Sequence, residues 1–222
     1  MARLIVSIPF HRYSIRLLKS YVLTIGLMLC TDIKPILGKT LHDKFEFASN
    51  DINRLWMQEF KALGRVWVTP RVYIYWSTLR TPCGTLGQGN ALYCPRNHSI
   101  YINQPFVNRI NRQVGDFAAI TVLAHEYGHA VQHLLGLSDM NRYLVQEELQ
   151  ADCLAGFYAQ SAMQRGLLDA SDIPEATAQS YYGGAPKFRL DSHGTSQQRV
   201  MAFRMGYSHG FQACLSYTTW SP

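Results

Sequence analysis

Residues 123–131 of this chain read LAHEYGHAV, which places His125 and His129 four positions apart with Glu126 directly after the first. In an α-helix, residues i and i+4 lie on one face, one turn apart, so both imidazoles point into the same space. Two such nitrogens are typical zinc ligands, and a glutamate rotated by about 100° borders the metal without binding it. The spacing predicts a helix that carries one zinc ion, with Glu126 as the general base acting on water.

The simpler interpretation is a helix with two unrelated histidines. Apolar residues on both sides of the motif, LA before it and AV after it, place these histidines inside the protein. Buried imidazoles need partners, and a shared cation serves both, so we favour the metal site. His133 continues the spacing but lies about 12 Å along the axis from His125, too far to bind the same ion. We interpret His133 as a structural or surface residue.

A zinc peptidase needs a third protein ligand, and the segment QEELQAD supplies it. Glu148 and Asp152 are again four apart, with small alanines beside them that let this helix approach the first one closely. We expect Glu148 to bind the metal and Asp152 to accept a hydrogen bond from a ligand histidine, which fixes its tautomer. Glu147 is the alternative ligand, but it lies about 100° around the helix and has no acidic residue at i+4.

Amide hydrolysis passes through an oxyanion, which a neutral or cationic donor stabilises. His193 is our candidate, since it precedes Gly194 in DSHGTSQQR, next to an expected helix N-terminus. Three tyrosines are further candidates: Tyr127, Tyr181 and Tyr182. The alternative for His193 is a capping or loop residue.

The elements that must position these side chains are mostly helical. Helices are predicted over 41–63, from Asp116 as cap to Gly136, over 142–165, from Ser171, and from within HGTSQQRV with Ser196 or Thr195 as cap. Strands are predicted over 71–76 and 99–103, around a glycine-rich hairpin. Few early strands followed by helices indicate an α+β fold with one core and a small, mainly antiparallel sheet.

Composition separates a leader from a body. The chain has 222 residues, 47% of them hydrophobic, and a net charge of +6. Residues 1–40 hold six basic residues and one acidic residue, whereas the rest is nearly balanced, so a nucleic-acid partner is not expected. The uncharged run SYVLTIGLMLC at 20–30 is too short for a membrane span, which needs about 20 residues, and suits the apolar part of an export signal. The alternative is an amphipathic helix over YSIRLLKSYVLTIGLMLC that lies on the body or on a membrane surface. We therefore expect a basic, apolar leader at 1–40, a catalytic domain at 41–222 and a cell-envelope location, exported or membrane-anchored.

Four of the five cysteines lie outside the leader, an even number that suits disulfides. Cys83 and Cys94 bracket CGTLGQGNALYC, whose glycines let the chain turn back, so a local disulfide is expected there. Cys153 could instead be a small buried apolar residue on its helix. The absence of C-x-x-C argues against a structural zinc knuckle.

At this point a family is visible. From about Ala48 to Cys214 the chain resembles the bacterial neutral zinc metallopeptidases, a gluzincin-type group with the zincin fold. Four segments carry the resemblance: CGTLGQGNALYCP, GDFAAITVLAHEYGHAVQHLLG, ELQADCLAG and HGTSQQRVMAFRMG. The resemblance implies zinc ligands at His125, His129 and Glu148, with Glu126 as base and Asp152 as the acidic partner on the ligand helix. It also implies an envelope setting and disulfides Cys83–Cys94 and Cys153–Cys214.

These expectations lead to a zinc-dependent peptidase acting on a peptide or protein. An extended substrate would add to the edge of the sheet, with 99–103 as the candidate strand. Two alternatives stay open: a non-catalytic envelope protein with a structural zinc site, and a zinc hydrolase of non-peptide amides. The occupant of the fourth coordination position distinguishes the peptidase from the protein with a structural zinc site. Water in that position indicates a catalytic zinc ion, and a fourth side chain indicates a structural one.

Overall fold

The structure is a computed structural model that describes residues 40–220. The expected leader at 1–40 therefore lies outside the described residues, apart from Thr40. Among the residues that are described, no helix is long and apolar enough to cross a membrane.

The first helix, α1 (Leu41–Ala62), follows the predicted bounds closely. Thr40 caps it and exchanges hydrogen bonds with Asp43, which forms a capping box. Its buried face carries Ile52, Trp56 and Phe60, spaced four apart, so one stripe of the helix faces the core.

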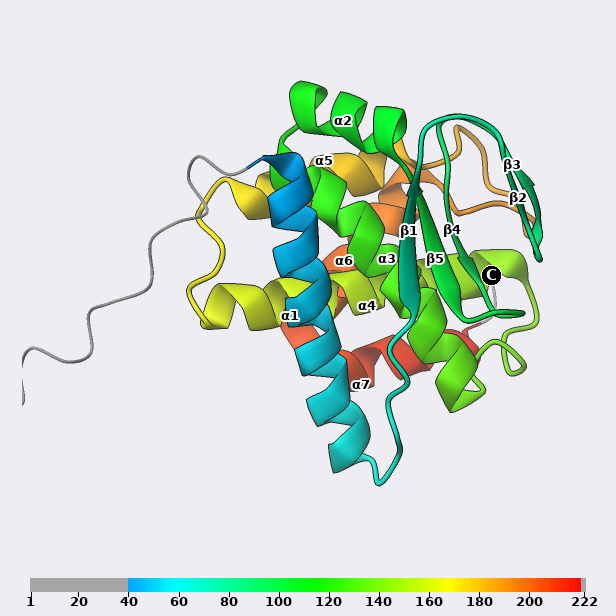
Figure 1. Ribbon diagram of the computed structural model, residues 1–222. Helices are drawn as coiled ribbons and strands as arrows, with labels where there is room; N and C mark the ends of the chain where they lie inside the picture. Colours follow the sequence, from blue (N-terminus) through cyan, green and yellow to red (C-terminus); the bar gives the residue numbers. More distant parts are fainter. Residues whose placement is uncertain (1–39, 221–222) are drawn as a thin grey trace, which may run out of the picture. The chain divides into compact units, whose positions relative to one another are not determined.

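The sheet is mixed, which corrects the expectation of a mainly antiparallel one. Its three strands are β1 (Arg71–Tyr75), β4 (Ala91–Cys94) and β5 (Ser99–Asn103), in the order β1-β5-β4. Strand β5 pairs in parallel with β1 and antiparallel with β4 (Figure 1). A separate antiparallel pair joins β2 (Leu79–Thr81) to β3 (Gly84–Leu86).

The central position of β5 overturns its predicted role as the substrate strand. Both its edges are occupied by other strands, and all five of its residues are buried. Strand β4 is at an edge of this sheet and packs against α3 (Asp116–Leu135), the helix that carries the histidine motif.

Helix α3 begins differently from the prediction. Gly115, with φ 146°, occupies the N-cap position and offers no side chain, so Asp116 is the first helical residue and pairs with Lys44 instead. The cap comes from another helix, since the Glu175 carboxylate accepts the Phe117 N–H at 3.0 Å. Gly136 ends α3 in the left-handed conformation, as its position predicts.

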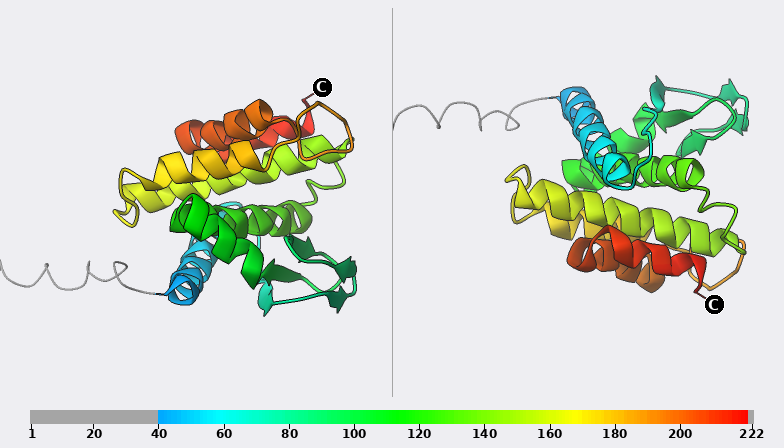
Figure 2. Two further views of the ribbon diagram at one scale, coloured as in Figure 1. Left: turned by 90° about the horizontal axis from the view of Figure 1, so that it is seen from above. Right: turned by 90° about the horizontal axis from the view of Figure 1, so that it is seen from below.

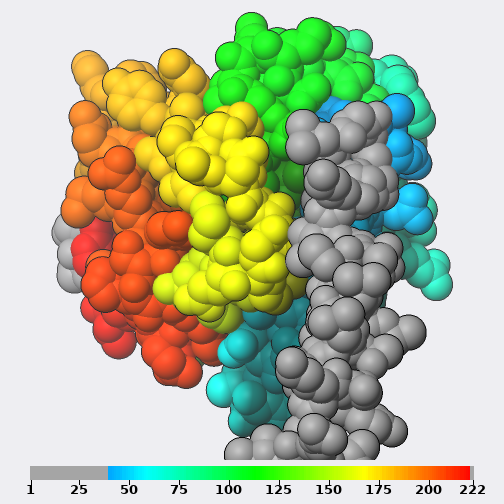
Figure 3. Space-filling model, turned by 90° about the vertical axis from the view of Figure 1, so that its left-hand side faces the viewer, coloured from blue at the N-terminus to red at the C-terminus, as the bar shows by residue number. Residues whose placement is uncertain are grey.

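Helix α3 lies in the middle of the described domain. It packs against α1, α2 (Gln104–Gln113) and β4 on one side and against α4 (Leu144–Gln164) and α5 (Asp172–Tyr182) on the other (Figure 2). Helix α6 (Ser196–His209), capped by Thr195, covers the far side of α4. In the space-filling view of Figure 3, α4, α5 and α6 form one continuous surface in yellow to orange.

Small residues set the spacing of these helices. A Cβ on Gly128 of α3 would lie 3.0 Å from the Ala151 carbonyl oxygen, so α3 and α4 meet at backbone distance. Between α4 and α6 the contact is closer still, because a Cβ on Gly156 would overlap the Phe203 carbonyl and one on Gly206 would overlap the Cys153 carbonyl. Only glycine fits at these two positions.

Both expected disulfides are present. Cys83–Cys94 ties the start of β3 to the end of β4 across 11 positions. Cys153–Cys214 ties the middle of α4 to the end of the short helix α7 (Phe211–Cys214) across 61 positions. Cys153 is therefore not a free core thiol.

Candidate metal centre

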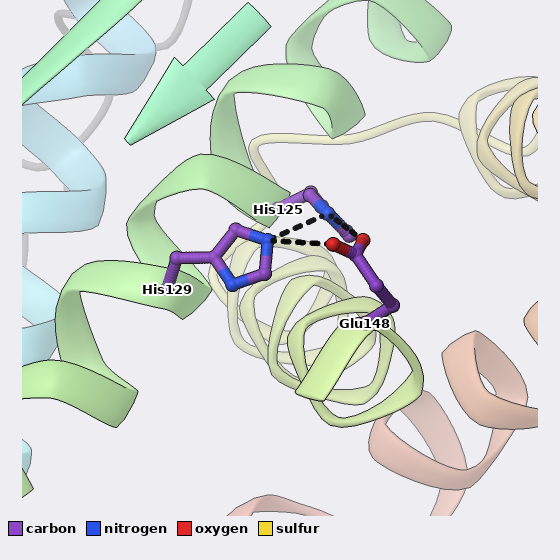
Figure 4. Close-up of side chains that lie close together, drawn as sticks. All are labelled: His125, His129 and Glu148. Carbon is purple, nitrogen blue, oxygen red and sulfur yellow. Dashed lines mark hydrogen bonds and ion pairs between the residues drawn. The ribbon is translucent and has the colours of Figure 1, made fainter. Parts of the chain in front are cut away.

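Three side chains from two helices converge on one point (Figure 4). His125 and His129 project from α3, and Glu148 projects from α4, where the alanine and glycine contact brings the helices together. Their ligand-capable atoms all lie within 4.8 Å of one another. The apolar flanks of the motif bury the group, as the sequence predicts, and the exposed fractions of the three side chains are 10%, 16% and 8%.

The distances match those around one small cation. The two Nε2 atoms are 3.1 Å apart, and Glu148 oxygens lie 3.2 Å from the Nε2 of His125 and 3.8 Å from that of His129. Two nitrogens bound tetrahedrally to one zinc ion at 2.0–2.1 Å would be separated by about 3.3 Å. The spacing therefore fits shared ligation by zinc.

The far sides of both rings are held by acceptors. The Nδ1 of His125 lies 2.9 Å from Asp152 Oδ1, and the Nδ1 of His129 lies 2.7 Å from Gln132 Oε1. Each Nδ1 must therefore carry a proton, which leaves the Nε2 lone pairs pointing at each other and at Glu148. Hydrogen bonding of this kind is what orients metal-binding histidines.

This convergence requires a positive charge at its centre. While both rings are neutral, the buried Glu148 Oε2 has no hydrogen-bond donor among the described residues; it lies 3.2 Å from His125 Nε2, which donates to it only when that ring is protonated. Burial lowers the pKa of His125, but the hydrogen bonds and charges of Asp152 and Glu148 outweigh it and raise that pKa to about 10. Burial raises the pKa of Glu148, and the neighbouring histidines outweigh it and hold that pKa below its usual range. A proton or a metal ion satisfies the group, and the donor set of two imidazoles and a carboxylate suits zinc.

Arg199 of α6 supports Asp152 and was missed by the sequence analysis. Its Nε and Nη2 donate to the two oxygens of Asp152, each at 2.7 Å, and its Nη1 donates to the Gly183 carbonyl at 3.0 Å. Burial raises the pKa of Asp152, whereas the Arg199 charge and hydrogen bonds outweigh it and lower that pKa. A bidentate arginine therefore keeps the partner of His125 ionised.

Glu126 lies beside the ligand group rather than in it. Its Oε2 accepts the backbone N–H of Tyr93, on strand β4, at 2.6 Å. Glu126 also lines a hollow of about 260 Å³ together with His125, His193 and Arg199. The carboxylate is thus fixed between the sheet edge and an open space next to the expected metal position.

Of the four expected oxyanion donors, the structure places one, His193, at the hollow and the three tyrosines elsewhere. His193 is 60% exposed, lines the same hollow and places Nε2 3.5 Å from Glu148 Oε2. Tyr127 is wrong as a candidate, because it is fully buried and its hydroxyl is hydrogen-bonded to Ser49 and Asn53 on α1. Residues 181 and 182 are exposed tyrosines that line a different groove, between α5 and α6, so they are also excluded.

The two remaining acidic and imidazole candidates lie outside the group. Glu147 accepts a hydrogen bond from Ser138 at 2.8 Å and does not reach the histidines. His133 is exposed at the surface near the Tyr93 ring. Gln132, like Arg199, is a residue that the sequence analysis did not identify, although its position three residues after His129 on the same helix is a usable signal.

Comparison with known proteins gives two kinds of match. Residues 37–217 match the family described as "Putative neutral zinc metallopeptidase". The chain is 34% identical to the uncharacterized protein YpfJ of Escherichia coli K12 over 183 residues, which cover 70% of this chain and 63% of that protein. It is 28% identical to the uncharacterized protein Mb2605 of Mycobacterium bovis over 194 residues, 72% of this chain and 65% of that protein. The matched region is thus just under two thirds of these relatives' length, and no solved structure matches.

Proposed function

The chain belongs to this neutral zinc metallopeptidase family, and from that premise we propose that it is a zinc-dependent peptidase. The observation that carries the proposal is the convergence of His125, His129 and Glu148 beside an open hollow lined by Glu126. Among the described residues the group holds three protein donors, which is the number in catalytic zinc sites, whereas structural sites use four. This favours catalysis over a structural zinc.

A zinc ion held by the two histidines and Glu148 would act as a Lewis acid that activates water and polarises the scissile carbonyl. The residues around the ion prepare its ligands. Asp152, held by Arg199, keeps His125 in the tautomer whose Nε2 lone pair faces the ion. The zincin-like fold that the resemblance implies is part of the same proposal, supported by the order of sheet, motif helix and glutamate helix.

Glu126 is the proposed general base. The Tyr93 N–H orients its carboxylate on one oxygen, and the side chain borders the hollow in which substrate would lie. From there it would take the proton of the attacking water and deliver it to the leaving amine. His193, which lines the same hollow, would donate a hydrogen bond to the developing oxyanion.

The substrate would bind as an extended peptide along β4. This strand is at the edge of its sheet, contacts α3 and carries the Tyr93 N–H that holds Glu126. Strand addition supplies main-chain hydrogen bonds and aligns the scissile bond with the neighbouring metal helix. The two disulfides support placing the protein in an oxidising compartment, outside the cytoplasm.

The test compares Glu126→Gln with Glu147→Gln. Glu126→Gln should bind one zinc ion per chain as the parent does, while cleavage of a peptide library falls by about 10²–10⁴-fold or more. Glu147→Gln is the matched control and should cleave normally, because the Glu147 side chain accepts a hydrogen bond from Ser138 and lies outside the ligand group. Parental turnover by Glu126→Gln would overturn the assignment of the base. A parent protein that binds zinc but cleaves no peptide would overturn the proposed function itself.

A further inference from the structure

A cluster of buried amides continues inward from His129. Gln132 and Gln150 are both fully buried, on α3 and α4. Gln132 Nε2 donates to Gln150 Oε1 at 3.0 Å and to the Glu147 carbonyl at 2.7 Å. Gln150 Nε2 in turn donates to the Cys214 carbonyl at 3.0 Å, and Asn141 donates to Gln150 Oε1 at 3.2 Å. The cluster joins the ligand pair of helices to the C-terminal segment.

The direction of every hydrogen bond in this cluster is fixed from its far end. The Cys214 carbonyl can only accept, so it must face the Gln150 amide nitrogen, and Gln150 Oε1 then faces Gln132. Gln132 must therefore donate to Gln150 Oε1 from its Nε2. The Glu147 carbonyl also accepts only from a donor, so it too must face Gln132 Nε2. Gln132 Oε1 is therefore the atom that faces His129, and the His129 Nδ1 must be the donor.

This order decides the state of the ligand nitrogen. A neutral imidazole that donates from Nδ1 has its lone pair on Nε2, the atom that lies 3.1 Å from the Nε2 of His125. If Gln132 were reversed, its NH₂ group would face His129 and favour the other tautomer, with a proton between the two rings. Reversal would also set oxygen against oxygen at both Glu147 and Gln150, so the cluster opposes it.

We propose that Gln132 and Gln150 are positioning residues that hold His129 in its metal-binding tautomer, with the Cys214 carbonyl as the fixed end of the relay. This inference rests on the proposed zinc site. Asp152 and Arg199 fix the tautomer of His125 through an ion pair. The two glutamines fix the tautomer of His129 through neutral amides. The Cys153–Cys214 disulfide fixes Cys214 to α4 and so keeps the terminal carbonyl in place.

The experiment measures zinc affinity, by competition with a chromophoric chelator, and the visible absorption of the Co²⁺-loaded protein. Gln132→Met keeps the length of the side chain but removes both the acceptor and the donors. It should bind zinc about 10- to 100-fold more weakly than the parent and show an altered Co²⁺ spectrum. Gln150→Met should shift both readouts in the same direction by a smaller factor, because Gln132 keeps its bond to the Glu147 carbonyl.

Gln146→Met is the matched control. Gln146 is also a buried glutamine of α4, but its amide bonds go to residues 142 and 143 and to the carbonyl groups of Tyr217 and Trp220. It should lose thermal stability and keep the parental zinc affinity. A fall in its zinc affinity equal to that of Gln132→Met would show a general disturbance of α4 and overturn the inference.

Gln132→Glu separates positioning from stability. A carboxylate can still accept from His129 Nδ1 but cannot donate to Glu147 or Gln150, so the protein should melt at a lower temperature yet bind zinc more tightly than Gln132→Met. Zinc affinity that follows the melting temperature across the variants would overturn the inference. Parental zinc affinity in Gln132→Met would also overturn it and leave the proposed peptidase intact, whereas a parent that binds zinc without cleaving peptides would end only the proposed function.

Discussion

Arg199 and Asp152 form a bidentate ion pair directly behind the His125 imidazole, with two contacts of 2.7 Å. A lysine cannot reproduce this geometry, because it offers one point charge in place of a planar fork. We predict that Arg199→Lys lowers zinc affinity by about tenfold and lowers the melting temperature.

A second bidentate pair in the same chain provides the control. Arg189 binds Asp191 with two contacts of 2.9 and 2.8 Å, but both side chains are exposed. Arg189→Lys should leave zinc affinity and the melting temperature unchanged. Equal behaviour of the two variants would show that Arg199 does not support the ligand set.

His193 should affect turnover and not metal binding. It is 60% exposed, approaches Glu148 only at 3.5 Å and lines the same hollow as Glu126. We predict that His193→Gln lowers kcat by about 10²–10³-fold, the usual effect of losing an oxyanion donor, with zinc affinity close to that of the parent. Steady-state kinetics and a zinc titration test this, with the exposed His133→Gln as control. A large loss of zinc in His193→Gln would instead indicate a fourth ligand.

Zinc binding should depend on pH through His125. In the metal-free protein its pKa is raised above the ordinary 6.5 to about 10, so its proton stabilises the fold fully below pH 6.5 and this contribution is lost as the pH rises through about 10. Zinc requires the neutral ring and must displace that proton. We predict that the apparent zinc affinity rises by about tenfold per pH unit between pH 7 and 9. Competition titrations at three pH values measure the slope, and a flat profile would contradict the shift.

Gly128 is predicted to set the distance between the two ligand helices. The Cβ of Gly128→Ala would meet the Ala151 carbonyl oxygen at 3.0 Å and its Cα at 3.1 Å, and backbone atoms cannot rotate away. Alanine adds about 1 kcal/mol of helix propensity, but overpacking costs about 1–3 kcal/mol, so the overpacking prevails. α4 should shift outward with Glu148, which lowers zinc affinity.

Gly87→Ala is the control for that experiment, since nothing lies within 4 Å of the added Cβ. Thermal melting and zinc titration of both variants test the prediction. Unchanged zinc affinity in Gly128→Ala would mean that the helices can adjust without moving Glu148.

The parts of the site that the sequence predicted share one property, which is periodicity within a helix. His125 and His129, and Glu148 and Asp152, each follow from a four-residue spacing, and their helices were predicted nearly to their observed ends. Arg199 could not be found this way, because its contact with Asp152 depends on how α6 packs on α4.

The sheet was predicted less well for a related reason. The run at 99–103 reads as a strand, but its central place depends on its pairing in parallel with β1, from which three other strands separate it in the sequence. Helix α2 was missed because only Val107 and Ile110 are buried in an otherwise polar segment with a proline in its first turn. Local patterns of residues do not encode these long-range pairings.

The two glycines at the crossing of α4 and α6 limit which substitutions this protein tolerates. Because Gly156 and Gly206 each exclude even a methyl group, a saturation library should recover no tolerated replacement at either position, while the surface residues around them vary freely. Directed evolution of a faster or differently selective enzyme would therefore have to change residues of strand β4 and of the loop at 183–195, and would leave this helix crossing unchanged.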